Sequence, residues 1–258
     1  KLNYIPSPNT IFKNIYKIPP ASILEIDLNI FKFKNLAYFN DLLKLPGIKL
    51  IKYWSLSNTN HNNLNNKSKL NELEDVLTNS VESQLISDAP LGAFLSGGID
   101  SSLIVSIASK LKKNIDTFTI GYNFDDYDES KHAEKIAKHL NTNHTTHICT
   151  KKDVLEKIPF LNDAFTEPFA DTSQIPTMLV SQIASSKVKV ALSGDGGDEL
   201  FCGYNRYIIT NKIKNLLYFM PFRLRIKLIN LLELFPEKLL KFILARITNQ
   251  NIDKKLQI

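Results

Sequence analysis

LGAFLSGGIDSS, residues 91–102, is an apolar run that ends in a small glycine-rich turn. A second apolar run follows it with helical spacing, from Leu103 to Leu111. This order predicts a strand, a tight loop and the first turn of a helix. Such a junction directs unpaired backbone N–H groups and the positive end of a helix dipole at one place, which suits a phosphate group.

The side chains of this loop also suit a phosphate. Gly97 and Gly98 carry no Cβ that would keep a phosphate away from the backbone. Asp100 supplies a carboxylate that could bind a metal ion. The loop is not a Walker A loop, because no Lys follows the glycines. Hydroxyl donors come from Ser96, Ser101 and Ser102.

A second glycine loop, SGDGGDE at residues 193–199, follows the apolar run 188–192. Loops that follow parallel strands gather at the carboxyl edge of an open sheet, where ligands bind. We therefore expect both loops to face one nucleotide, with Asp100 and Asp198 sharing magnesium. Two purely structural turns would not explain why carboxylates and hydroxyls accompany the glycines in both loops. Five of the nine glycines lie in these loops: Gly97, Gly98, Gly194, Gly196 and Gly197.

Apolar runs of strand length recur along the chain, with helical patterns before and between them. The first helical pattern covers residues 70–81. This alternation predicts an α/β fold, a parallel sheet with helices on both faces. The predicted strands are residues 91–95, 116–121, 145–148 and 188–192.

Local signals predict several boundaries. The polar loop 123–129 ends near Asp128, which is predicted to cap the next helix rather than to join Asp125 and Asp126 in a metal site. Pro176 is placed in the first turn of a later helix.

The composition excludes several classes of protein. The net charge of +6 is spread along the chain without an arginine cluster, so a nucleic-acid partner is not expected. No apolar run reaches the length of a membrane span, and none resembles a signal peptide. Cys149 and Cys202 are the two cysteines, too few for a disulfide framework or a zinc site. A reducing cytoplasm is the expected setting.

Together the two loops resemble the synthetase domain of class B asparagine synthetases, which hydrolyse glutamine. Three further features carry the resemblance: Glu167-Pro168, Asp171, and Gly203-Tyr204. The first loop matches the SGGxDSS motif of the ATP pyrophosphatase superfamily. The resemblance covers about residues 4–207 and implies the adenine nucleotide alpha hydrolase-like fold.

The resemblance also implies a set of site residues. Adenine would lie against the main chain at Leu95 and Ile120. Asp100 and Asp198 would bind Mg²⁺, and Asp195 stands where the family usually has a Glu linked to forming the acyl-adenylate. Further ATP contacts would come from Ser193 and Gly194. Pyrophosphate would lie on Ser96, Gly97, Gly98, Ser101 and Ser102.

The implied reaction is an ATP-dependent amidation. A carboxylate, with aspartate as the first expectation, is activated as an acyl-AMP with release of pyrophosphate, and ammonia then forms the amide. Asp195, and Gly197 in place of a common Ser, look more like paralogues found with surface-polysaccharide genes. Two other interpretations stay open: a related loop enzyme acting on tRNA, and an ATP-binding module without turnover.

The resemblance divides the chain. Residues 1–57 look like the end of a glutaminase-type domain, 58–69 like a linker, and 70–258 like a C-terminally incomplete synthetase domain. The glutaminase nucleophile is an N-terminal Cys, whereas Lys1 begins this chain, so ammonia would come from a glutaminase domain outside it. The chain is therefore expected to be a fragment, and a homodimer is possible. Helices are expected in residues 205–258, interrupted by Pro221 and Pro236.

Overall fold

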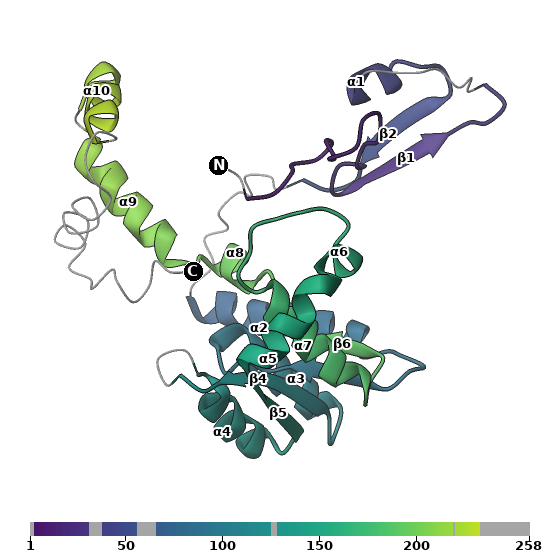
Figure 1. Ribbon diagram of the computed structural model, residues 1–258, viewed down its shortest axis with the longest axis vertical. Coiled ribbons are helices and arrows are strands. Elements are labelled where there is room, and N and C mark those ends of the chain that lie inside the picture. The colour runs from purple at the N-terminus through teal and green to yellow at the C-terminus, as the bar shows by residue number, and fades with distance from the viewer. Residues whose placement is uncertain (1–2, 31–37, 56–65, 125–127, 219, 233–258) are drawn as a thin grey trace.

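The computed structural model describes residues 3–30, 38–55, 66–124, 128–218 and 220–232. They form an N-terminal appendage, the described part of residues 3–55, and a sheet domain that follows it (Figure 1). The predictions for residues 58–65, for Asp125 and Asp126, and for residues 233–258 with Pro236 lie outside these ranges.

The sheet domain is built on four parallel strands in the order β5-β4-β3-β6. Phe94 pairs with Phe118 of the neighbouring strand, and Ala93 pairs with Leu192 on the other side. The predicted parallel sheet is confirmed, although β6 begins two residues later than expected, because the Val188 N–H still bonds to Ala184 at the end of the preceding helix. The strands are β3 Leu91–Phe94, β4 Asp116–Tyr122, β5 Asn143–Cys149 and β6 Val190–Leu192.

Helices cover both faces of this sheet, as predicted. On one face, α2 Asn66–Gln84, α3 Ile99–Leu111 and α4 Ser130–Leu140 pack on alternate residues of β3. On the other face, α7 Gln174–Ser185 packs against Phe118 and Phe94. Burying a side chain such as Leu95 or Val105 completely stabilises the fold by about 1.5–3 kcal/mol.

Short elements connect β5 to α7. Helix α5, Lys151–Lys157, begins with a capping box: the Asp153 N–H donates to the Thr150 hydroxyl at 3.2 Å, and the Asp153 carboxylate accepts the Thr150 N–H at 2.7 Å. The chain continues through a 3₁₀ turn, Ile158–Phe160, and α6 Leu161–Ala164. The segment between α6 and α7 then arches toward the appendage (Figure 1).

Two helices, α2 and α4, begin at other residues than the sequence predicted. Helix α2 begins at Asn66, so the last four residues of the predicted linker are helical. Helix α4 has Glu129 rather than Asp128 at its N-cap position. Asp128 Oδ1 still accepts the backbone N–H groups of Ser130 at 3.1 Å and Tyr122 at 3.2 Å, and so ties the end of β4 to the start of α4. The hydrogen bond from the Ser130 side chain lowers the pKa of Asp128.

The appendage contains an antiparallel pair, β1 Ser22–Ile26 and β2 Ile48–Lys52, and one short helix, α1 Phe39–Leu42. Apolar and polar residues alternate over residues 23–27, the pattern of a half-buried strand, and β1 covers most of them. Phe39 is buried, and its ring lies 5.9 Å from that of Tyr16. At the other end of the chain, α9 Asn205–Leu217 and α10 Phe222–Leu232 lead away from the sheet domain and are separated around Pro221, as predicted (Figure 1).

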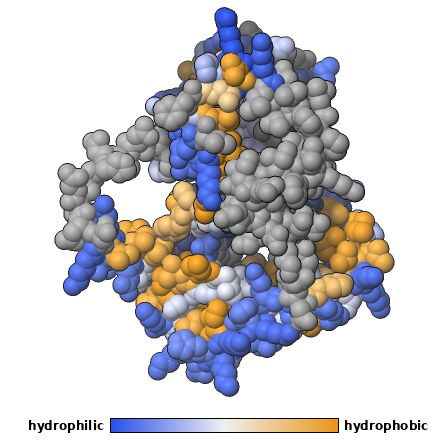
Figure 2. Space-filling model, turned by 90° about the vertical axis from the view of Figure 1, so that its left-hand side faces the viewer, coloured by the Kyte–Doolittle hydropathy of each residue, from blue (hydrophilic) through white to orange (hydrophobic). Residues whose placement is uncertain are grey.

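Large apolar side chains stay exposed on both parts of the molecule, and Figure 2 shows hydrophobic patches on one face. Exposed apolar surface of this kind is typical of contacts with another domain or chain. No helix in the described ranges is long and apolar enough to cross a membrane. The most exposed of these side chains include Leu28, Ile86, Ile99 and Leu200.

Candidate active site

The first glycine loop connects β3 to α3 and packs closely on α4. Gly97 has φ +87°, a conformation that favours glycine, and a Cβ there would lie 2.9 Å from the Ala133 nitrogen. Gly98 is the N-cap residue of α3. The backbone N–H groups at this helix start therefore face the carboxyl edge of the sheet, as the sequence predicted.

Hydroxyl groups hold the shape of this loop. The Ser96 and Ser101 hydroxyls lie 2.9 Å apart, and the Ser96 N–H donates to Ser101 Oγ at 3.2 Å. The Ser102 hydroxyl donates to the Gly98 carbonyl at 2.6 Å. These contacts fix the loop before any ligand arrives, which lowers the ordering cost of binding.

The second glycine loop meets the first. It connects β6 to the short helix α8, Gly197–Phe201. A Cβ on Gly194 would lie 2.7 Å from the Ser101 nitrogen, and one on Gly197 would lie 2.7 Å from Asp100 Oδ2. The glycines are therefore required because the two loops touch, and the predicted convergence of the loops is confirmed.

A cleft of about 760 Å³ opens where the loops meet. An adjoining hollow of about 260 Å³ lies beside it, and Phe94, Ser96 and Glu129 line both. The hollow is largely apolar, with walls that include Phe118, Ile120, Pro176 and Val180. Carboxylates dominate the charge of the larger cleft: Asp100, Glu129, Asp195, Asp198 and Glu199.

Most of the predicted site residues line these two spaces. Leu95 and Ile120, against which the family resemblance implies adenine, line the apolar hollow. Within the described part of the chain, Gly97 and Ser102 line neither space, because Gly97 packs on α4 and the Ser102 hydroxyl bonds within its own helix. The predicted residues that line the larger cleft are Ser96, Gly98, Asp100, Ser101, Ser193, Gly194, Asp195 and Asp198.

Sequence reasoning left several cleft residues unassigned, among them Glu129, Glu199 and Tyr204. Glu129 was treated as part of a polar loop, although it directly precedes a helix whose start faces the sheet edge. Tyr204 was noted only as part of a motif. Its hydroxyl donates to Glu199 Oε1 at 2.7 Å, which raises the pKa of Tyr204 to about 12 and lowers the pKa of Glu199. The Arg206 guanidinium lies 4.6 Å from the Tyr204 ring centre.

The carboxylates fit a magnesium ion of the kind held jointly by protein and phosphate. Magnesium prefers oxygen ligands and is commonly bound by one or two carboxylates together with substrate phosphates. Asp100 and Asp198 both line the cleft on opposite loops. Among the described residues, no group of three or more His, Cys, Asp or Glu side chains converges on one point. A two-carboxylate site completed by phosphate oxygens does not need a third.

The fold and the cleft define an α/β protein in which two glycine loops meet at the carboxyl edge of a parallel sheet. The sequence model of the asparagine synthase family matches residues 72–253. This chain belongs to the asparagine synthase family.

Several proteins of known name are similar to this chain. Asparagine synthetase [glutamine-hydrolyzing] 1 of Bacillus subtilis is 33% identical over 207 residues, which cover 79% of this chain and 30% of that protein. A Methanocaldococcus jannaschii protein named as a glutamine-hydrolysing asparagine synthetase is 34% identical over 209 residues, which cover 80% of this chain and 37% of that protein. The chain thus spans about a third of the length of these relatives.

Among solved structures, the NH3-dependent NAD synthetase of Campylobacter jejuni is similar with a TM-score of 0.36 and 17% identity. The match covers 74% of this chain and 96% of that one. A likeness this weak carries no argument about function.

Proposed function

We propose that this chain carries the ATP-dependent amide-forming half of an asparagine synthetase-like ligase. The single observation that carries the proposal is the contact of Gly194 and Gly197 with Asp100 and Ser101, which makes one cleft out of two glycine loops. A helix start, bare backbone and carboxylates at one sheet edge suit a nucleotide triphosphate with its magnesium. Adenine would occupy the apolar hollow, and the phosphates the larger cleft.

In the proposed reaction, a carboxylate oxygen of the acceptor attacks the α-phosphorus of ATP. The bond from that phosphorus to the bridging oxygen breaks, and pyrophosphate leaves. Backbone N–H groups in the first turn of α3 would stabilise its growing charge. Magnesium at Asp100 and Asp198 would supply positive charge to the same oxygens. Ammonia then attacks the acyl carbon, AMP leaves with the electrons of the C–O bond, and the nitrogen loses a proton.

The acceptor is proposed to be aspartate, with an acidic sugar as the second candidate. Asp195 favours the second, because it is one methylene shorter than the Glu usual in the asparagine-forming enzymes. The structure gives Asp195 an exposed carboxylate at the cleft, where it would face an acceptor. Its backbone N–H donates to the Ser193 hydroxyl at 3.4 Å.

Ammonia is proposed to come from a glutaminase domain, because the similar proteins are named as glutamine-hydrolysing. Residues 1–57 would then be the end of that domain, and residues 70–258 part of the synthetase domain. The exposed apolar surface of the appendage suits such a neighbour. Both cysteines are free, which fits a reducing cytoplasm.

Exchange of labelled pyrophosphate into ATP tests the proposal, with a panel of carboxylic acids supplied one at a time. Exchange that requires aspartate supports the first acceptor, and exchange that requires a uronic acid supports the second. Asp198→Asn should lower the exchange rate about 10²–10³-fold, the usual loss when transition-state charge is left uncompensated. Glu156→Gln, which alters an exposed ion pair on α5, should leave it unchanged. ATP binding without exchange under any acid would reduce the chain to a binding module.

A further inference from the structure

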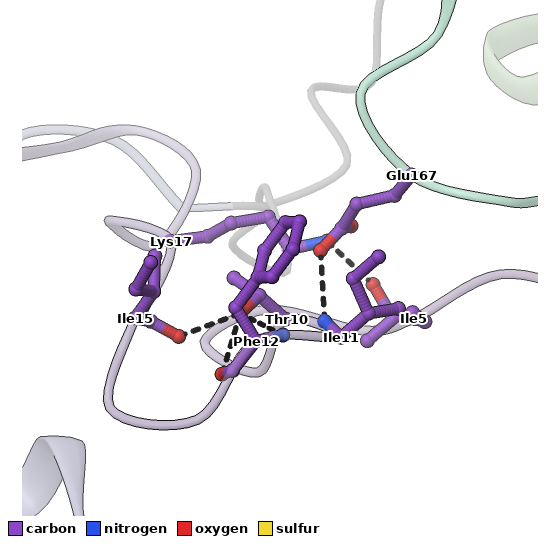
Figure 3. A network of polar contacts seen from close by, with 7 residues as sticks. All are labelled: Ile5, Thr10, Ile11, Phe12, Ile15, Lys17 and Glu167. Carbon is purple, nitrogen blue, oxygen red and sulfur yellow. Dashed lines mark hydrogen bonds and ion pairs between the residues drawn. The ribbon is translucent and has the colours of Figure 1, made fainter. Parts of the chain in front are cut away.

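A compact loop of the appendage, residues 5–17, lies against Glu167 of the sheet domain (Figure 3). The Thr10 hydroxyl donates to the Ile15 carbonyl at 2.7 Å and accepts the Phe12 N–H at 3.1 Å. The Lys17 N–H closes the loop on the Pro8 carbonyl at 2.9 Å. The loop therefore holds its own shape and presents Ile11 and Lys17 together.

Glu167 of the sheet domain receives this loop with both carboxylate oxygens. Oε2 pairs with Lys17 Nζ at 2.5 Å, and Oε1 accepts the Ile11 N–H at 3.3 Å (Figure 3). Lys17 Nζ also donates to the Ile5 carbonyl at 2.8 Å. A second link joins the same two segments, since the Ala170 N–H donates to the Asn3 carbonyl at 2.7 Å.

This pair differs from an ordinary surface ion pair, which stabilises a protein by at most about 1 kcal/mol. The side chain of Glu167 is 18% exposed and that of Lys17 is 37% exposed. Each partner also bonds to backbone, so losing one side chain leaves the other polar group half-buried and short of a partner.

The turn after Glu167 leads directly to the wall of the apolar hollow. Gln174 Nε2 donates to the carbonyls of Phe169 at 2.8 Å and Asp171 at 3.0 Å. Asp171 Oδ1 accepts the Ser173 N–H at 2.8 Å. Gln174 begins α7, whose Pro176 and Thr177 line the apolar hollow. Hydrogen bonds to the appendage at Glu167 and Ala170, and hydrogen bonds within residues 169–174, therefore flank one short backbone segment that leads from the appendage to the first turn of α7.

We propose that Glu167 is a positioning residue: by clamping Lys17 and Ile11, it lets the docked appendage set the first turn of α7 and so the shape of the apolar hollow. The part of this inference that concerns the nucleotide rests on the proposed function. The clamp itself does not. A domain that docks on the appendage would thereby change the shape of the nucleotide site.

Hydrogen exchange of the whole chain tests the clamp without any ligand. Glu167→Gln keeps the shape and an acceptor for Ile11 but removes the charge, and Lys17→Met removes the other charge at similar length. Either should speed exchange in residues 3–17 and 165–177 about tenfold, while residues 91–111 keep their protection. The double variant should match the single ones, because the pair acts as a unit. Lys17→Arg should restore protection, and Glu156→Gln should change nothing.

Affinity for Mg-ATP supplies the second readout. The charge-removing variants should raise its Kd severalfold with an unchanged melting temperature of the sheet domain, and Lys17→Arg should return Kd to the wild-type value. Two results would overturn the inference. One is faster hydrogen exchange in residues 3–17 with an unchanged rate in residues 165–177. The other is a double variant whose exchange rate rises by the sum of the single effects. If the wild-type chain fails to bind Mg-ATP, the proposed function is wrong. The hydrogen-exchange rates still show whether the contact of Glu167 with Lys17 and Ile11 holds the two segments together.

Discussion

At the scale of single residues, the proposed nucleotide would bring its ribose against Glu129. It lines both the apolar hollow and the acidic cleft, and a ribose joins the base to the phosphates. A carboxylate accepts hydrogen bonds from sugar hydroxyls, and such charge-assisted bonds contribute about 1.5–3 kcal/mol. Glu129→Ala should therefore lower the preference for ATP over 2′-deoxy-ATP about tenfold or more, measured as the ratio of the two Kd values by calorimetry.

Glu134→Gln is the matched control for that measurement. Glu134 lies on α4, the helix that has Glu129 at its N-cap position. It is exposed and accepts a hydrogen bond from Thr146 instead of lining the cleft. Its variant should keep the wild-type ratio. A Glu129→Ala protein that still discriminates fully between the two nucleotides would contradict the placement of the ribose.

Tyr204 gives a second prediction, which needs no ligand. Its hydrogen bond to Glu199 stabilises the neutral phenol beside a carboxylate, and this raises the pKa of Tyr204 to about 12. Glu199→Gln removes the negative charge, so the pKa of Tyr204 should fall toward its ordinary value of 10.0. Ultraviolet titration should then show one more tyrosinate at about pH 11 in the variant than in the wild type. Identical titration curves would show that the Tyr204–Glu199 bond does not form in solution.

At the scale of elements, the two glycine loops depend on each other. A Cβ on Gly194 would lie 2.7 Å from the Ser101 nitrogen and 2.9 Å from the Asp100 carbonyl carbon, and neither backbone atom can move aside like a flexible side chain. Gly194→Ala should therefore separate the loops and weaken Mg-ATP binding at least about tenfold, because misplacing binding groups by an ångström has effects of that size or larger. Calorimetry measures the affinity, and thermal unfolding shows whether the fold persists.

Gly98→Ala is the control for this loop contact. Gly98 has ordinary backbone angles, φ −71° and ψ 167°, and the nearest atom to a new Cβ is the Ser96 hydroxyl at 3.3 Å. A methyl group there meets no atom of the second loop, so thermal unfolding should change much less than with a methyl group at Gly194. Equal losses of thermal stability in the two variants would mean that the contact between the loops is not what requires glycine at position 194.

The strands of the sheet and its longer helices could be predicted because each carries its own signal. The run 91–95 is apolar at every position and is followed by glycines, so the sequence predicts both the strand and the loop. The predictions were wrong at the ends of helices and strands, because tertiary contacts determine where these elements begin and end. Asn66 is polar, yet α2 already includes it. Val188 is β-branched, yet its N–H completes the end of α7 instead of joining β6.

The site was predictable in part for the same reason. Two glycine loops after parallel strands must meet at one edge, and the contact between Gly197 and Asp100 is such a meeting. The pairing of Lys17 with Glu167 has no such signal. The two residues are 150 positions apart, and no local pattern in an irregular loop specifies a partner at that distance.

At the scale of the whole molecule, one half-buried histidine inside the sheet domain links stability to pH. His144 lies in β5, and its Nδ1 is 2.9 Å from the Thr117 hydroxyl, which is itself 2.8 Å from the Thr142 hydroxyl. Its Nε2 is buried without a hydrogen-bond partner among the described residues. Burial lowers the pKa of His144, although the nearby Glu134 opposes the shift. The fold therefore favours the neutral ring.

The direction of the effect on stability follows from this shift. Because the pKa of His144 is lower in the folded chain than its ordinary value of 6.5, the unfolded state binds more protons as pH falls through 6.5. The free energy of unfolding should be constant above that pH and decrease below it, by at most about 1.4 kcal/mol per pH unit for one proton. The carboxyl groups whose pKa is lowered, among them Asp153 and Asp171, add their own loss only near pH 4 and below.

Urea unfolding at a series of pH values from 7.5 to 5 isolates the contribution of His144. His144→Asn can keep the bond to Thr117, since its side-chain amide reaches the position of Nδ1, but it cannot titrate in this range. The decrease in unfolding free energy below pH 6.5 should therefore be smaller in this variant than in the wild type. His139→Asn alters an exposed histidine on α4 and should keep the wild-type dependence. If His144→Asn instead retains the full decrease, the proton taken up on unfolding belongs to another group, and the buried ring does not couple stability to pH.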